Sequence, residues 1–118
     1  MARVEKVRWW HWLPIPRRKW RVVARTEGAD LVPERLPRHG IALAGARARP
    51  KWAVFDCPCG HGHRLMLNLD PARHPVWRVL SDEPLSLRPS IDDLTAERRC
   101  HFWIRDGRTV WVQDDRRT

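Results

Sequence analysis

The sequence predicts a small, mainly β domain of antiparallel strands, preceded by a basic, tryptophan-rich N-terminal arm. Three leucines alternate with other residues over residues 64–69, which is the period-two pattern of a half-buried strand. Asp106-Gly107 lies between two further alternating runs, and this dipeptide is a strong signal for a tight hairpin. The four tryptophans and clustered arginines of the first 25 residues distinguish the arm from the rest of the chain.

The length of 118 residues favours a single folded unit, because a core of roughly 100 residues is about the smallest that is comfortably stable. We therefore divide the chain into an arm, residues 1–25, and a β domain, residues 26–118. No apolar run approaches the roughly 18 residues of a membrane helix, and no signal peptide follows the charged start. We expect a cytoplasmic protein with no membrane partner.

The arm concentrates the positive charge of the chain. Eight of the 23 Lys and Arg residues lie in it beside one acidic residue, so +7 of the net charge of +9 belongs to the arm. Pro14 and Pro16 forbid a continuous helix. We expect an extended segment that contacts a partner, most often a protein, because Trp and Arg are common interface anchors, although nucleic acid also fits. The candidate contact residues are Trp9, Trp10, Trp12, Arg17, Arg18, Lys19 and Trp20.

The strands of the domain can be placed in order along the chain. Residues 19–25 and 40–45 favour short strands, and a sharp loop at 57–63 separates strands over 52–56 and 64–70. Further strands are expected over 76–80, 85–90, 100–105 and 108–112, and at most a helical turn over 92–99. A two-residue loop at Asp106-Gly107 would set Arg105 opposite Arg108, Trp103 opposite Val110 and Phe102 opposite Trp111.

The three cysteines point to a metal site. An odd number in a chain without an export signal argues against a disulfide framework. Cys57 and Cys59 are followed closely by two histidines, and zinc prefers thiolate and imidazole ligands. One loop of this size rarely supplies four ligands, so either Cys100 or His101 is expected to complete the site. Neighbours in a strand point to opposite faces, so one of these two is favoured. The first-choice ligands for Zn²⁺ are Cys57, Cys59, His61 and Cys100, with His101 and His63 as alternates.

Residues 57–62 read Cys-Pro-Cys-Gly-His-Gly, and residues 100–111 read Cys-His-Phe-Trp-Ile-Arg-Asp-Gly-Arg-Thr-Val-Trp. These two segments resemble the bacterial and phage domain-of-unknown-function 6527 family, which pairs a CPCGCG-type loop with a later SHFWIR-type hairpin. Weaker similarities bring the resemblance to about residues 30–112. His61 stands where the family has a third loop cysteine, and Arg98 stands where its last cysteine is expected. The resemblance implies zinc binding and an accessory role among prokaryotic ubiquitin-like conjugation genes.

We interpret the protein as a non-catalytic zinc-binding module that acts as an accessory or interaction protein. Four protein ligands close a structural zinc site, and the sequence shows no other convergent catalytic set. The first alternative is nucleic-acid binding through the arm, whose cations can neutralise phosphates while its tryptophans stack on bases. The second is an enzyme, with an open zinc position or a Cys57 thiolate activated by a histidine. The H-x-E and P-C-x-x-C pattern of zinc deaminases is absent.

Overall fold

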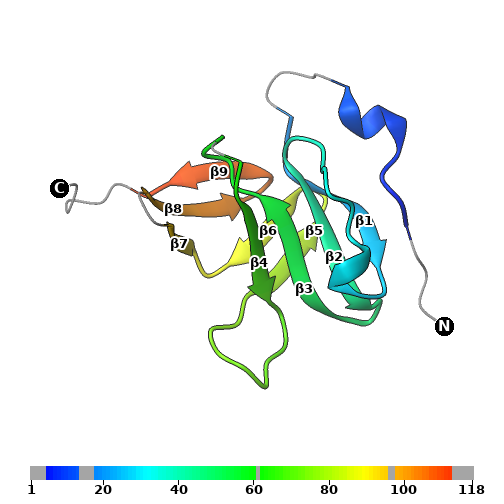
Figure 1. Cartoon of the computed structure of the whole chain (residues 1–118). Coiled ribbons are helices and arrows are strands. Elements are labelled where there is room, and N and C mark those ends of the chain that lie inside the picture. The colour runs from blue at the N-terminus through cyan, green and yellow to red at the C-terminus, as the bar shows by residue number, and fades with distance from the viewer. Residues whose placement is uncertain (1–4, 14–17, 61, 96–97, 113–118) are drawn as a thin grey trace.

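The computed structural model describes residues 5–13, 18–60, 62–95 and 98–112, and these residues form a mainly β domain (Figure 1). The largest sheet has the order β1-β2-β3-β4. Its strands are β1 (Arg21–Thr26), β2 (Gly40–Ala46), β3 (Arg49–Asp56) and β4 (Arg64–Asn68). β1 and β2 are parallel, and the other neighbours are antiparallel. The connection from β1 to β2 includes a short 3-10 helix, η2 (Ala29–Leu31), and gives the chain the length that a parallel crossover needs.

Two smaller antiparallel sheets complete the domain. One pairs β5 (Arg78–Asp82) with β6 (Leu85–Arg88), and the other has the order β7-β8-β9. Its strands are β7 (Ile91–Thr95), β8 (Arg98–Arg105) and β9 (Arg108–Trp111). The register of the last hairpin confirms the prediction from Asp106-Gly107, because Phe102 pairs with Trp111, Trp103 with Val110 and Arg105 with Arg108. Both loop residues have positive φ, as the tight hairpin turn requires.

Trp20 joins the three sheets. Its backbone N–H donates to the carbonyl oxygen of Gly107 over 2.8 Å, and its own carbonyl accepts from the N–H of Leu85 over 3.1 Å. The indole N–H donates to Thr109 Oγ1 over 2.8 Å, and the ring packs edge-on against Phe55. Only 1% of Trp20 is exposed. The main core lies around it, with members from all three sheets, including Ile41, Phe55, Leu85, Leu87, Ile91, Phe102 and Ile104.

The structure changes two expectations. Residues 92–99 do not include a helical turn in their described part, because Ile91–Thr95 pair with β8 as strand β7. The run of charges in this segment hid the strand, since it lacks an apolar alternation. Second, buried Trp20 presents no indole face to a partner. The division of the chain at residue 25, which falls within β1, stays a prediction. The sequence placed Trp20 among the contact residues, whereas its size and apolar surface make it a core residue.

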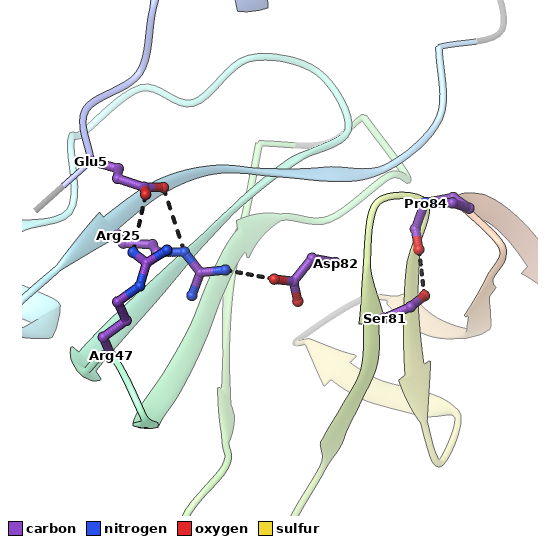
Figure 2. Close-up of polar contacts among 6 residues, drawn as sticks. All are labelled: Glu5, Arg25, Arg47, Ser81, Asp82 and Pro84. Atoms are coloured by element: carbon purple, nitrogen blue, oxygen red, sulfur yellow. Dashed lines mark hydrogen bonds and ion pairs between the residues drawn. The ribbon is translucent and has the colours of Figure 1, made fainter. Parts of the chain in front are cut away.

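The N-terminal residues include a 3-10 helix, η1 (Trp9–Trp12), which Figure 1 shows on the far side of the domain from β7–β9. Glu5 attaches this segment to the largest sheet. Its backbone forms two hydrogen bonds with Arg25, of 2.9 and 2.7 Å, and its carboxylate pairs with Arg25 and Arg47 (Figure 2). Among the described residues, no helix combines the length and apolar character needed to cross a membrane.

Candidate functional site

A tight loop between β3 and β4 carries three candidate ligands. Cys57 follows the end of β3, Cys59 lies within the loop and His63 comes directly before β4. The loop closes because the N–H of Cys57 donates to the carbonyl oxygen of His63 over 2.9 Å. Gly60 and Gly62 have φ angles of +80° and +82°, which glycine adopts at little cost. This closure brings the side chains of Cys57 and His63 to the same end of the hairpin.

Cys100, in β8, adds the fourth candidate ligand from a distant part of the chain. The ligand atoms of Cys57, Cys59, His63 and Cys100 all lie within 4.8 Å of one another. His63 Nε2 is 3.0 Å from Cys59 Sγ and 3.9 Å from Cys100 Sγ. Donors of a tetrahedral zinc ion, at about 2.0–2.3 Å from the metal, lie about 3.3–3.8 Å apart. The cluster can therefore hold a metal ion, as the sequence predicted for this loop and β8.

The chemistry of the donor set suits a divalent cation. Burial raises the pKa of the Cys57 thiol well above its ordinary value, and the thiols of Cys59 and Cys100 add to the rise. Burial also raises the pKa of Cys100. Three neighbouring sulfur atoms in such surroundings become thiolates readily when a divalent cation compensates their charge. Three cysteines and one histidine form a common structural zinc set.

Asp93 lies behind the histidine of the cluster. Its Oδ2 is 3.4 Å from His63 Nδ1, the ring nitrogen that faces away from the sulfur atoms. Both atoms are buried, and neither has a hydrogen bond within the described part of the chain. Histidines that bind metals commonly direct their second nitrogen toward a carboxylate, which fixes the ring and makes the ligand more basic. The position of Asp93 suits this supporting role.

A second polar pair lies on the other face of β8. His101 Nε2 is 3.0 Å from the hydroxyl oxygen of Ser90, which lies between β6 and β7. Both side chains are half-buried, so a ligand can reach them. The carbonyl of Ser90 accepts a 3.3 Å hydrogen bond from the indole N–H of Trp77, which holds the backbone at this serine. A hydroxyl next to an imidazole nitrogen is the basic unit of nucleophilic catalysis by serine.

Asp92 is the pairing partner of His101 in the ladder between β7 and β8. Directly opposed residues of an antiparallel pair share a face of the sheet, so the carboxylate lies on the side of the imidazole. Arg99 binds this carboxylate through two nitrogens, at 2.9 and 2.6 Å. The Arg99 hydrogen bonds lower the pKa of Asp92, and the charge of His101 acts in the same direction. Asp92 therefore remains ionised near the imidazole without binding it directly.

The predicted ligands separate into three groups. The structure brings Cys57, Cys59 and Cys100 together with His63, which the sequence offered as an alternate. His101, the other alternate, instead contacts Ser90. His61 lies outside the described residues, so its role as a ligand stays a prediction.

The predicted arm contacts are spread over different environments. Trp9, Trp10 and Trp12 are 73%, 46% and 45% exposed, whereas Trp20 is buried. Lys19 is exposed, and Arg18 is half-buried with its carbonyl bound to His39. Arg17 lies outside the described residues. Only the three η1 tryptophans among the predicted aromatic contacts therefore present indole surface.

Sequence reasoning gave no role to Ser90, Asp92 or Asp93. Their closeness to the histidines depends on the pairing of β7 with β8, and β7 was not predicted. Two local signals were available in the sequence. Ser90 comes directly before an apolar residue and two adjacent aspartates, and His101 points to the face of its strand opposite to that of Cys100.

No curated protein and no solved structure matches this chain. The model of one protein family matches residues 28–112, which include the cysteine loop, Ser90 and the final hairpin. That family is described as bacterial ubiquitination-like system serine protease, or BubE. Its description confirms the predicted connection of the family with ubiquitin-like conjugation, whereas the narrower resemblance to domain-of-unknown-function 6527 stays a prediction. Because the match covers well over half of its length, this chain belongs to the BubE family of bacterial ubiquitination-like systems.

Proposed function

We propose that this protein is a serine protease of a bacterial ubiquitination-like system, with Ser90 as its nucleophile and His101 as its general base. The observation that carries this proposal is the 3.0 Å contact between Ser90 Oγ and His101 Nε2. The family description supports the reaction class. The distance is within the range at which an imidazole can take the proton of a hydroxyl.

The other serines of the chain support the choice of Ser90. The sequence contains three serines, and all of them are described. The hydroxyl of Ser81 donates to the carbonyl of Pro84 over 2.5 Å (Figure 2). Ser86 Oγ accepts from the N–H of Asp106 over 2.8 Å. Both hydroxyls have structural partners in turns, and Ser90 alone contacts a histidine among the described residues.

The geometry supports a two-step reaction. Ser90 Oγ attacks the carbonyl carbon of the substrate while His101 Nε2 accepts the hydroxyl proton. The tetrahedral species collapses, the carbon–nitrogen bond breaks and His101 returns the proton to the leaving amine. Water then attacks the resulting ester, its proton passes to His101 and finally to Ser90 Oγ, and the carboxylic product leaves. Asp92 lies on the same face and is paired with Arg99, so its carboxylate offers the imidazolium a partly compensated negative charge in both steps.

We assign the Cys57, Cys59, His63 and Cys100 cluster to a structural Zn²⁺ ion. Four protein donors leave no position for a substrate, and the cluster lies on the face of β8 away from Ser90. When bound, zinc would join the loop after β3 to β8 and contribute folding free energy on the order of 10 kcal/mol. Removal of zinc with a strong chelator should lower Tm sharply, and readdition should restore it. An unchanged Tm after complete removal would refute a structural role.

A fluorophosphonate probe tests the proposed nucleophile, because it reacts covalently with activated serines. The natural protein should be labelled, and peptide mapping should place the adduct on Ser90. Ser90→Ala should abolish labelling, whereas Ser81→Ala should retain it. Absence of labelling in the metal-loaded natural protein would favour the non-catalytic module that the sequence suggested. An adduct elsewhere would contradict the assignment of Ser90.

The exposed tryptophans of η1 support a second, compatible role in partner binding. Trp9, Trp10 and Trp12 expose much of their surface, and Arg8 and Arg35 lie over the rings of Trp10 and Trp12 at 5.7 and 5.6 Å. Such aromatic and arginine groups are typical protein interface anchors, so we propose a protein partner. A combined alanine variant of the three tryptophans should lose that partner. Salt-sensitive binding of an oligonucleotide, lost in the same variant, would favour nucleic acid instead.

A further inference from the structure

A cavity of about 1000 Å³ lies next to β5, between the β2–β3 hairpin and the segment that joins β4 to β5. Its wall includes five cationic side chains and two carboxylates, Asp70 and Asp82. The cations are Arg25, Arg47, Arg49, Lys51 and Arg78. Apolar side chains of Leu43, Leu69, Trp77 and Val79 form other parts of the wall. The cavity thus combines an apolar surface with an excess of positive charge.

Part of this charge is already compensated within the protein. Arg25 binds Asp82 at 2.6 Å and Glu5 at 3.5 Å, and Arg47 binds the same Glu5 at 3.0 Å (Figure 2). The carboxylate of Asp70 accepts a hydrogen bond from the backbone N–H of Ala72, so this carboxylate is engaged within the turn that Asp70 begins.

The remaining cations have no such compensation. Arg49, Lys51 and Arg78 are exposed, and none of them has an ion pair among residues 5–13, 18–60, 62–95 and 98–112. These three cations are available to an anionic ligand.

Trp77 connects the cavity to the proposed nucleophile. Its side chain lines the cavity, and its indole N–H donates to the carbonyl of Ser90 over 3.3 Å. Its backbone N–H donates to the carbonyl of Asn68, at the end of β4, over 2.8 Å. One side chain is thus shared by the cavity wall and the backbone of Ser90.

We propose that this cavity binds an acidic, partly apolar segment of the polypeptide substrate. Carboxylates of the segment would pair with Arg49, Lys51 and Arg78, while its apolar side chains would cover Leu69 and Val79. The identification of the bound segment as substrate rests on the proposed protease function. A peptide fits better than a nucleic acid, because Trp77 is the one aromatic residue in the described wall, whereas single strands need several stacking surfaces.

The test uses metal-loaded full-length Ser90→Ala protein and a short fluorescein-labelled peptide in which Glu and Leu alternate. Fluorescence anisotropy should show saturable binding that weakens with salt, and a matched peptide with Gln in place of Glu should bind at least about tenfold more weakly. The double change Arg49→Glu and Arg78→Glu should weaken binding of the Glu peptide to a similar extent. Arg108→Glu, an exposed change on the final hairpin outside the cavity, should leave it unchanged.

Three results would overturn the proposal: equal affinity for the Glu and Gln peptides, no effect of the double change in a variant with the natural Tm, or displacement of the Glu peptide by an oligonucleotide at lower concentration. Fluorophosphonate labelling separates this proposal from the protease assignment. Labelling of Ser90 without selective binding of the Glu peptide would refute the cavity proposal alone. Selective binding without labelling would refute the protease assignment and leave the cavity as an acidic-peptide site.

Discussion

Cys100 and His101 are neighbours in β8, and their side chains serve two different groups on opposite faces of the strand. Cys100 Sγ lies 3.9 Å from His63 Nε2 in the cysteine cluster, whereas His101 Nε2 lies 3.0 Å from Ser90 Oγ. The facing strand, β7, has the same arrangement. Asp93 pairs with Cys100 and shares its face of the sheet, whereas Asp92 pairs with His101 and shares the opposite face. The period-two geometry of a strand thus separates a candidate metal site from a candidate catalytic pair within one ladder.

Substitutions of these two neighbours should therefore have different effects. Cys100→Ser should remove a zinc ligand, lower the bound metal per chain and reduce Tm, because a serine hydroxyl is a poor replacement for a thiolate. His101→Asn should retain the metal and nearly the natural Tm, while the rate of fluorophosphonate labelling falls about 100-fold or more. Metal analysis, thermal melting and labelling rates measure both variants. Loss of metal in His101→Asn would contradict the separation.

Asp93 should strengthen metal binding through His63. Asp93→Asn removes the negative charge 3.4 Å from His63 Nδ1, so we expect zinc affinity to fall about 10–100-fold. Competition with a chromophoric chelator measures this change. Asp92→Asn is the matched control, since it removes the neighbouring charge on the opposite face and should leave zinc affinity unchanged. Equal losses in the two variants would indicate a general charge effect rather than support of His63.

His39 should make stability depend on pH. Burial lowers its pKa, and the nearby charges of Arg38 and Arg21 act in the same direction; the ring stacks on Trp20 at 4.8 Å. As pH falls below about 6.5, the unfolded chain takes up a proton at this histidine before the folded protein does, so folding becomes less favourable. The pH dependence ends once the pH is below the lowered pKa of the folded state.

His39→Asn tests this dependence. Asn tolerates the positive φ of 58° at this position but does not titrate in this range. The stability advantage of the natural protein over the variant should be greatest near neutral pH and should shrink as pH falls. Urea unfolding at several pH values measures it. A constant difference across the range would show that His39 does not contribute to the pH dependence.

A side chain at position 107 should destabilise the protein. Its φ is +79°, and an added Cβ would lie 2.6 Å from Lys19 Cβ and 3.0 Å from Pro84 Cβ, where the start of β1 meets the other two sheets. Gly107→Ala should lower the free energy of unfolding by about 1 kcal/mol for the backbone conformation and by about 1–3 kcal/mol for overpacking. Gly60→Ala has nearly the same φ, +80°, with no atom within 4 Å of the added Cβ, so it isolates the backbone contribution. Similar losses in the two variants, measured by urea unfolding, would contradict the packing argument.

Local sequence signals predicted much of the fold. The Asp106-Gly107 turn set the register of the final hairpin, and the prolines and glycines of residues 57–63 marked the sharp turn between β3 and β4. Both follow from backbone preferences within a few residues. β7 could not be predicted in this way, because its charged residues acquire their strand conformation through pairing with β8. Likewise, the apolar surface of Trp20 was equally consistent with a buried position and with an interface. Trp20 is buried because the three sheets meet around it.

The amino-acid pattern alone predicts a mainly β protein in which a cysteine loop and a distant hairpin approach one another to form a candidate metal site. Spacing and alternation carry that information, because they fix which side chains of one element share a face. The folded chain, in contrast, places His63 beside the three cysteines and His101 beside Ser90. These choices depend on how the β3–β4 loop closes and how β7 aligns with β8. Contacts between residues far apart in the chain set both, and no local pattern in the sequence encodes them.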